Sequence, residues 1–168
     1  MTLRDAQEND LAQILEIYNE VIATSTAIYR EAPATLEDRL AWWRAKREAG
    51  HPTLVADDGG TVIGFATFGD FRPWPGYRFT VEHSVHVHRD HRGRGVGTAL
   101  MHPLIERANS LGKHVMIAGV DAENRASIAF HERLGFERVA HFREVGFKFG
   151  RWLDLVFLQT LLTGSAKC

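Results

Sequence analysis

The segment that most limits the fold is a glycine-rich stretch in the middle of the chain, residues 91–100 (HRGRGVGTAL). An alternating apolar run, residues 81–87, leads into it, and a helical pattern, residues 96–111, leads out of it. Glycine permits a tight turn and lets a ligand approach the backbone closely. Because this turn opens a helix, its first amide N–H groups lack carbonyl partners and, with the helix dipole, favour a phosphate or pyrophosphate. The segment therefore predicts a loop that binds a phosphate-bearing cofactor.

Three kinds of phosphate loop can be compared with this segment. A P-loop ends in Gly-Lys-Ser/Thr, which does not occur here. A dinucleotide loop has the spacing G-x-G-x-x-G near the start of a doubly wound domain, whereas here Gly97 comes one residue too early and the loop lies in mid-chain. The third pattern is R-x-x-G-x-G, formed by Arg92, Gly95 and Gly97, and the alternative is a glycine-rich turn with incidental arginines. The expected phosphate contacts are Arg92, Gly93, Arg94, Gly95, Val96, Gly97 and Thr98.

A second segment, residues 124–136 (NRASIAFHERLGF), has a helical pattern with its own start and stop signals. Asn124 is a typical N-cap, and Gly135 is a typical left-handed C-terminal stop. The R-x-x-G-x-G string between a strand and a helix, followed by this segment, resembles the two cofactor blocks of the GNAT acetyltransferase superfamily. That resemblance implies acetyl-coenzyme A as the acetyl donor, with Asn124 and Ser127 among its contacts.

Length and composition favour one α/β domain over residues 1–163, followed by a flexible tail, residues 164–168. A formal net charge of −1 argues against nucleic acid or a membrane surface as the main partner. No signal peptide or membrane-length apolar run is evident, so we expect a cytoplasmic protein. The single cysteine, Cys168, is the last residue, which excludes an intramolecular disulfide and disfavours a cysteine nucleophile.

The patterns along the chain predict the order β-α-α-β-β-β-α-β-α-β-β, a mixed sheet with flanking helices. Asn9 and Thr35 are expected helix caps, and Pro103 is expected to bend its helix or remove one of its hydrogen bonds. Residues 57–60 (DDGG) predict a hairpin turn. The resemblance implies about seven mostly antiparallel strands, splayed between strands 80–87 and 114–120.

Glu82 is the candidate general base. Strand alternation places Glu82, Ser84 and His86 on one face and the valines at positions 81, 85 and 87 on the other. A carboxylate on the strand that leads to the cofactor loop is well placed to take a proton, although a solvated or salt-bridged glutamate is the alternative. The resemblance favours the catalytic role, because acyl transfer requires a neutral amine and Glu82 can remove its proton directly or through water.

His131 occupies the position where the superfamily has a tyrosine that protonates the departing thiolate. His131 either takes that acid role or only contacts the cofactor. Without an internal cysteine, direct transfer in a ternary complex is expected. The resemblance further implies that the pantetheine arm pairs along Val85, His86 and Val87, with a backbone N–H near Val87 polarising the acetyl carbonyl.

Four histidines, at positions 83, 86, 88 and 91, raise the question of a metal site. Positions 86 and 88 share a strand face, but the other two point elsewhere and no cysteine or carboxylate completes a ligand set. We therefore expect no metal, and we expect His83 to pack within the sheet.

The loop at residues 70–78 (DFRPWPGYR) combines three aromatic residues and two arginines with turn-forming residues. Such loops often bind a ligand, although covering the end of the sheet is the alternative. Together with residues 17–19, 80–85, 114–116 and 146–154, this loop resembles the phosphinothricin N-acetyltransferase family. Within that family the similarity is greatest to the bacterial branch that acetylates L-methionine sulfoximine and L-methionine sulfone.

This closer resemblance implies acetylation of the α-amino group of small amino-acid-like substrates, phosphinothricin included, by a homodimer with its site near the subunit interface. The expected substrate contacts are Arg72, Trp74, Pro75, Gly76, Tyr77, Arg78 and Lys148, where the arginines meet the carboxylate, the loop lines the pocket and Lys148 meets the polar head. Lys148 or Trp152 is expected to act across the interface. Two other readings stay open, a peptide N-acetyltransferase and a non-catalytic acyl-coenzyme A sensor, and the sequence leaves the physiological substrate open.

Overall fold

The computed structural model describes residues 1–162, so the expected tail, residues 164–168, lies outside the described residues. The element order is the one that the sequence patterns predict. The elements are β1 (Thr2–Asp5), α1 (Leu11–Thr24), α2 (Leu36–Glu48), β2 (Thr53–Asp58), β3 (Thr61–Asp70), β4 (Thr80–Val87), α3 (Val96–Ser110), β5 (Val115–Asp121), α4 (Arg125–Arg133), β6 (Glu137–Lys148) and β7 (Arg151–Leu161).

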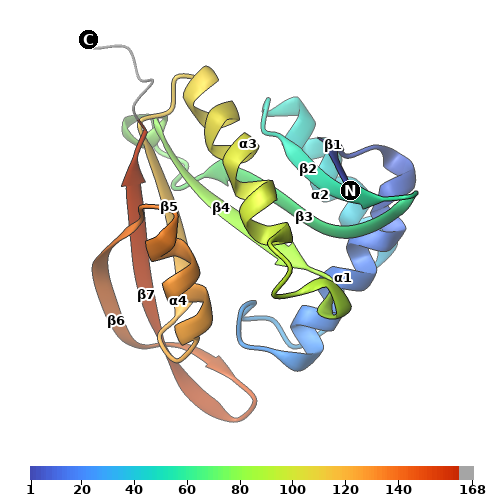
Figure 1. Cartoon of the computed structure of the whole chain (residues 1–168). Coiled ribbons are helices and arrows are strands. Elements are labelled where there is room, and N and C mark those ends of the chain that lie inside the picture. The colour runs from blue at the N-terminus through green and yellow to red at the C-terminus, as the bar shows by residue number, and fades with distance from the viewer. Residues whose placement is uncertain (163–168) are drawn as a thin grey trace.

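The strands form one seven-stranded sheet in the order β1-β2-β3-β4-β5-β7-β6. Every neighbouring pair is antiparallel except β4 and β5, which run parallel. These two strands pair only between Thr80–Glu82 and Val115–Ile117, and beyond those residues they diverge (Figure 1). The expected splay is confirmed, and it opens the middle of the sheet at the end of β4 that leads to the glycine-rich loop.

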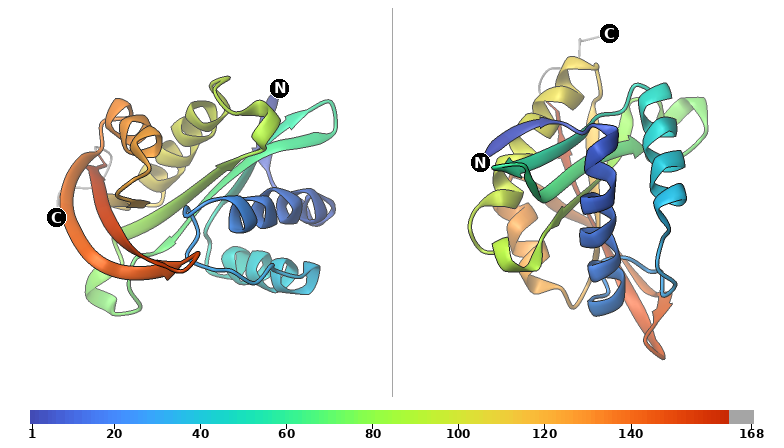
Figure 2. Two further views of the ribbon diagram at one scale, coloured as in Figure 1. Left: turned by 90° about the horizontal axis from the view of Figure 1, so that it is seen from below. Right: turned by 90° about the vertical axis from the view of Figure 1, so that its right-hand side faces the viewer.

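Helices cover both faces of the sheet. α1 and α2 lie on one face, and α3 and α4 lie on the other (Figure 2). Leu100, Leu104 and Ile128 belong to the buried core beneath α3 and α4. A second buried cluster, which includes Ile14 and Trp43, packs α1 and α2 on β2 and β3. Within residues 1–162, no helix combines the length and the apolar character needed to cross a membrane.

Most of the local signals act as expected. Thr35 and Asp38 form a reciprocal capping box at α2, and the Asn124 side chain accepts a hydrogen bond from the Ser127 N–H at 3.0 Å. Gly135 ends α4 with φ +86°. In the hairpin between β2 and β3, the Asp57 carboxylate accepts from the Gly60 N–H at 2.7 Å. These local predictions are correct because each depends on conformations or hydrogen bonds within a few residues of the chain.

Two local expectations need correction or refinement. Asn9 is not the cap of α1, because a 3-10 turn, Glu8–Asp10, precedes that helix and Asp10 is its N-cap residue. The Asp10 carboxylate accepts from the Gln7 N–H at 2.7 Å and pairs with Arg4. Pro103 lies inside α3, which continues through it as one helix, and as a proline it has no backbone N–H to donate to the helix.

Candidate active site

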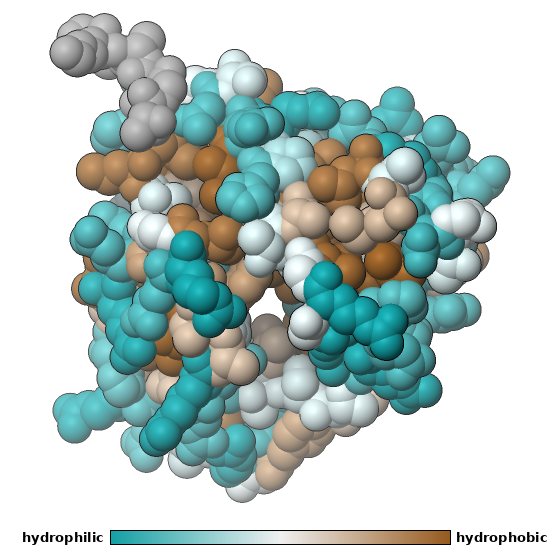
Figure 3. All heavy atoms as spheres, viewed as in Figure 1, coloured by the Kyte–Doolittle hydropathy of each residue, from teal (hydrophilic) through white to brown (hydrophobic). Residues whose placement is uncertain are grey.

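The glycine-rich loop folds as a cradle at the start of α3. Gly93 and Gly95 adopt left-handed conformations, with φ +73° and +81°. Gly95 is the N-cap residue of α3, and in the described part of the chain no side chain caps this helix, so its first-turn N–H groups lack a side-chain acceptor there. A cavity of about 460 Å³ opens over this turn, and Figure 3 shows the surface hollowed between the loop and α4. Its lining residues are Val85, Val87, His91, Arg92, Gly93, Gly95, Val96, Gly97, Thr98, Ala126, Ser127, Phe130 and Arg133.

The two arginines of the loop differ in their surroundings. Arg92 Nε donates to the Val87 carbonyl at 3.0 Å, and its guanidinium also pairs with Glu20 of α1. Arg92 therefore ties the loop to β4 and α1 as well as lining the cavity. Arg94 is exposed and does not line the cavity, so of the seven residues expected at the phosphate it is the one placed outside.

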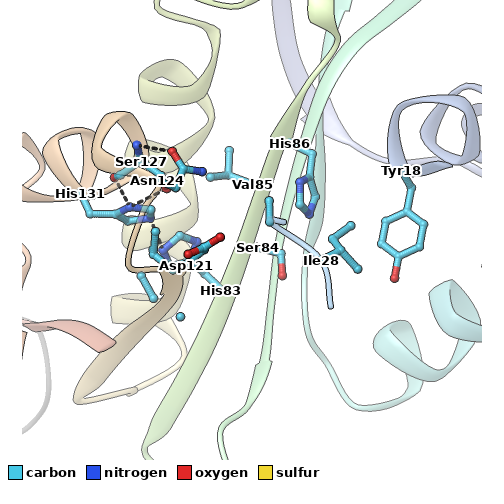
Figure 4. Close-up of a pocket in the computed structure, with 14 residues that line it drawn as sticks. Tyr18, Ile28, His83, Ser84, Val85, His86, Asp121, Asn124, Ser127 and His131 are labelled. Carbon is cyan, nitrogen blue, oxygen red and sulfur yellow. Dashed lines mark hydrogen bonds between the residues drawn. The ribbon is translucent and has the colours of Figure 1, made fainter. Parts of the chain in front are cut away.

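A second cavity, of about 290 Å³, lies where β4 and β5 diverge. Figure 4 shows its labelled side chains reaching in from α1, the loop after α1, β4 and α4. The lining residues are Tyr18, Ala27, Ile28, His83, Ser84, Val85, His86, Ala118, Gly119, Val120, Asp121, Asn124, Ser127 and His131. Val85 and Ser127 line both cavities, so the two spaces adjoin.

The edge of β4 in this region is free for a ligand backbone. Within the described residues, β4 pairs with β5 only up to Glu82, whereas its pairing with β3 continues to Val87. The His88 N–H donates to β3, at the Ile63 carbonyl, 2.9 Å away. Because N–H directions alternate along a strand, the N–H groups of Val85 and Val87 point to the opposite, unpaired edge.

Glu82 lies at the point where the paired part of β4 ends. A Cβ added at Gly119 of β5 would lie 2.9 Å from Glu82 Oε1, so a side chain at position 119 would force the Glu82 carboxylate to shift. Burial raises the pKa of Glu82 above its usual range, while the positive charges of Arg72 and Lys46 act in the opposite direction. Glu82 is thus a half-buried carboxylate whose affinity for a proton is increased. It does not itself line the second cavity, although its neighbours His83 and Ser84 do.

His131 and His83 form a buried imidazole pair with a defined tautomer. His131 Nδ1 lies 2.7 Å from the Ser127 carbonyl oxygen, which can only accept, so Nδ1 carries the proton. Burial lowers the pKa of His131 and lowers that of His83 to about 3, so both rings are neutral near pH 7. His131 Nε2 must then accept from His83 Nε2, 3.2 Å away. Among residues 1–162, no hydrogen-bond partner reaches the buried His83 Nδ1.

His86 faces α1 from the opposite side of β4. Its ring lies 5.3 Å from that of Phe65 and 6.2 Å from that of Tyr18. Burial lowers the pKa of His86 to about 4, and the charges of Arg39 and Arg92 contribute. His86 therefore presents a neutral imidazole to the second cavity, which it lines together with Tyr18.

The loop at residues 71–78, where the substrate contacts were expected, lies exposed on the surface and lines neither cavity. Phe71 anchors it, with ring centroids 5.9 Å from Tyr77 and 5.8 Å from Phe157 of β7. Arg72 lies over the Phe71 ring at 5.0 Å, and its charge acts on Glu82. Trp74 is 70% exposed. The remaining expected contacts, Pro75, Gly76 and Arg78, are also exposed.

Lys148 is not where the sequence reasoning placed it. It is fully buried, and its ammonium group donates to the carbonyls of Ile22, Ser25 and Ile28 at 2.6, 2.7 and 2.7 Å. An ammonium group has three N–H donors, so none is left for the polar head of a substrate. Lys148 therefore binds backbone carbonyls of its own chain instead of the expected polar head of the substrate.

Several lining residues of the second cavity were missed by sequence reasoning. They come from α1 (Tyr18), the loop after it (Ala27 and Ile28) and β5 (Asp121), and although Tyr18 lies in one of the segments that carry the family resemblance, none of the four was expected at the site. Asp121 is buried at the end of β5, where its carboxylate accepts from the Thr26 hydroxyl and from the Glu123 N–H. Within residues 1–162, no three His, Cys, Asp or Glu side chains gather as a possible metal site.

Known proteins resemble this chain over nearly its whole length. Residues 14–136 match the model of the Acetyltransferase (GNAT) family. The L-methionine sulfoximine/L-methionine sulfone acetyltransferase of Salmonella typhimurium is 48% identical over 99% of this chain and 97% of its own. The phosphinothricin N-acetyltransferase of Alcaligenes faecalis is 38% identical over 98% of this chain and 84% of its own.

A solved structure agrees with these matches. A putative acetyltransferase from Salmonella typhimurium, crystallised with its cofactor acetyl-CoA, superposes with a TM-score of 0.94 and 46% identity, covering 99% of this chain and 96% of that one. The family resemblance and the fold class inferred from the sequence are thereby confirmed.

Proposed function

Because this chain belongs to the acetyltransferase (GNAT) family, we propose that it transfers the acetyl group of acetyl-coenzyme A to the α-amino group of small amino-acid-like substrates. The proposed acceptors are L-methionine sulfoximine and L-methionine sulfone, with phosphinothricin as a related one. The observation that carries the proposal is the pair of adjoining cavities at the splay, one over the uncapped start of α3 and the other beside Glu82 and His131.

The first cavity fits the donor. The free N–H groups at the start of α3 suit a pyrophosphate, and the unpaired edge of β4 suits an amide-bearing pantetheine arm. When bound, acetyl-coenzyme A supplies the acetyl group as an activated thioester. The N–H of Val87, directed to the open edge, would polarise the acetyl carbonyl.

Glu82 is the proposed general base. An α-ammonium group must lose a proton before its nitrogen can attack, and burial has already increased the affinity of Glu82 for a proton. The new N–C bond then forms as the C–S bond breaks, without an acyl-enzyme intermediate on sulfur, since residues 1–167 contain no cysteine.

His131 is the proposed source of the proton that the departing thiolate takes up. In the neutral ring the Nδ1 proton is held by the carbonyl of Ser127, a residue common to both cavities, and losing it would leave an imidazolate. The donating form is therefore the imidazolium, which would give one proton to the thiolate and return to the neutral ring. His83 holds the far side of the ring through Nε2. A histidine that only contacts the donor is the alternative, and the pH dependence of His131→Phe separates the two roles.

The acceptor is proposed to enter from the side of α1 and the 71–78 loop. Arg72 and Arg78 would supply positive charge for an α-carboxylate on that side, outside the two cavities. Trp74, Pro75, Gly76 and Tyr77 would supply surface along the same approach. A homodimer is part of this proposal. Exposed apolar side chains gather on the β6–β7 hairpin and suit a second copy of the chain: Val139, Phe142, Val145, Phe147, Phe149, Trp152 and Leu161. We assign the enzyme a cytoplasmic, detoxifying role.

The test is thiol release from acetyl-coenzyme A with a panel of methionine sulfoximine, methionine sulfone, phosphinothricin, ordinary L-amino acids and short peptides. Turnover of the sulfoximine and sulfone, with the N-acetyl product identified by mass spectrometry, is the expected result. Turnover of peptides alone would keep the donor and overturn the acceptor. Acetyl-coenzyme A binding without turnover of any amine would favour a sensor.

A further inference from the structure

One wall of the second cavity is formed by a connecting loop. Residues 25–35 join α1 to α2 without a helix or strand of their own, and Ala27 and Ile28 from this loop line the cavity. A loop without regular hydrogen bonding keeps its position only through contacts with its surroundings. The contacts of this loop therefore decide the shape of the cavity.

Several of those contacts reach the far half of the sheet. The Tyr29 hydroxyl donates to the Asp154 carbonyl of β7 at 3.2 Å, and the Tyr29 ring lies directly against Gly146 of β6. The Phe149 N–H, at the tip of the β6–β7 hairpin, donates to the Glu31 carboxylate at 2.9 Å. The loop is thus fastened to the hairpin, on the opposite side of the splay from α1 and α2 (Figure 1).

Lys148 is the centre of this attachment. Its three acceptors lie in the last turn of α1 (Ile22), at the residue that caps that helix (Ser25) and in the cavity wall (Ile28). A cation is favourable at a helix C-terminus, where carbonyl groups lack helical partners. One ammonium group therefore fixes both the point at which α1 ends and the position of Ile28.

We propose that Lys148 is a positioning residue for acceptor selection, which holds the wall at Ala27 and Ile28 so that the cavity admits some amines and rejects others. The inference rests on the proposed function, because it assumes that an amine occupies this cavity. No residue from 25–35 lines the cavity over the glycine-rich loop, so the attachment acts on the acceptor and not on acetyl-coenzyme A.

The experiment compares Lys148→Met with Arg138→Met. Methionine keeps the length of the side chain but removes the ammonium, and Arg138 is a control on the same strand whose contact is an exposed ion pair with Glu132. For Lys148→Met we expect the KM for the best amine to rise about 10-fold, because a misplacement of about 1 Å caused far from the reacting atoms can cost about 10²-fold and the expected displacement is smaller. The kcat/KM ratio between preferred and poor amines should fall, while the Kd for acetyl-coenzyme A stays at the wild-type value.

A purely structural lysine predicts something different. In that case Lys148→Met lowers the Tm but leaves the amine KM and the selectivity unchanged below the Tm, and this result would overturn the proposal. Should Lys148→Met not fold, Tyr29→Leu loosens the same wall from a partly exposed position and must change the selectivity in the same direction. Absence of amine turnover in the wild type would refute the proposed function instead, so the two failures are distinguishable.

Discussion

Replacing Glu82 by glutamine removes the proposed base with almost no change of shape. Glutamine still fits beside Gly119, where the backbone leaves room for the carboxylate. Proton transfer by a positioned base contributes about 10²–10⁴-fold to a rate. An α-amino group with a pKa near 8 is only about one-tenth neutral at pH 7, so a variant without the base must wait for that fraction. We therefore expect kcat/KM at pH 7 to fall by about 10²–10³-fold.

The pH dependence of the rate tests the general-base role of Glu82 more sharply than the rate at pH 7 does. Between pH 7 and pH 9 the neutral fraction of such an amine rises about tenfold, and the rate of Glu82→Gln should rise with it. The wild type should gain less, because Glu82 already removes the proton. Thiol release measured across this range gives both curves, and Glu132→Gln, at an exposed glutamate of α4, is the matched control.

Stability provides an independent check on the same residue. Burial raises the pKa of Glu82 in the folded protein, so its contribution to stability is present below the unfolded-state pKa and is lost as the pH rises through the folded-state pKa. At pH 7 the ionised carboxylate therefore opposes folding, and Glu82→Gln should not lower the Tm. Full activity of the variant, or a deficit that is the same at pH 7 and pH 9, would refute the general-base role.

Three further predictions concern the surroundings of the site. Gly119→Ala places a Cβ 2.9 Å from Glu82 Oε1 and 3.2 Å from the Phe157 ring, so kcat should fall about 10-fold or more while acetyl-coenzyme A still binds in a calorimetric titration. Lys46→Met removes a positive charge that lowers the pKa of Glu82, so the acid limb of the kcat/KM profile should move to higher pH; a limb that moves to lower pH contradicts the assignment. Gly95→Ala forces an alanine to φ +81°, at a cost of about 1–2 kcal/mol. The Tm should drop by about 2–8 °C and the Kd for acetyl-coenzyme A should rise, whereas an unchanged Kd would argue against a phosphate site at this turn.

The cofactor loop and its helix could be predicted because their signals are local. Gly93 and Gly95 supply left-handed backbone, and Asn124 caps α4 through a bond three residues along the chain. The turn between β2 and β3 likewise depends on glycines and on Asp57 within the turn. Each of these local structures results from the conformational preferences of a few neighbouring residues.

Sequence patterns gave a wrong prediction where a side chain contacts residues far away along the chain. The carbonyls that bind Lys148 lie 120 to 126 residues away along the chain. A lysine between two aromatic residues in a predicted hairpin gives no sign of them, so a solvent-facing substrate contact was expected instead. The prediction that Asn9 caps α1 was also wrong, because the ion pair between Arg4 and Asp10 fixes the start of this helix.

Local sequence patterns specify the order of the elements, the glycine turn at the start of α3, the strand that carries Glu82 and, by resemblance, the acetyltransferase family. The environment of each reactive group depends instead on how distant segments pack together. Desolvation and proximity depend on which strands and helices meet, so only the fold could place Gly119 opposite Glu82, pair His83 with His131 and bring Ile28 to the cavity wall. Backbone geometry is written into short stretches of sequence, whereas the pKa of a carboxyl group and the shape of a cavity result from contacts between segments far apart in the chain.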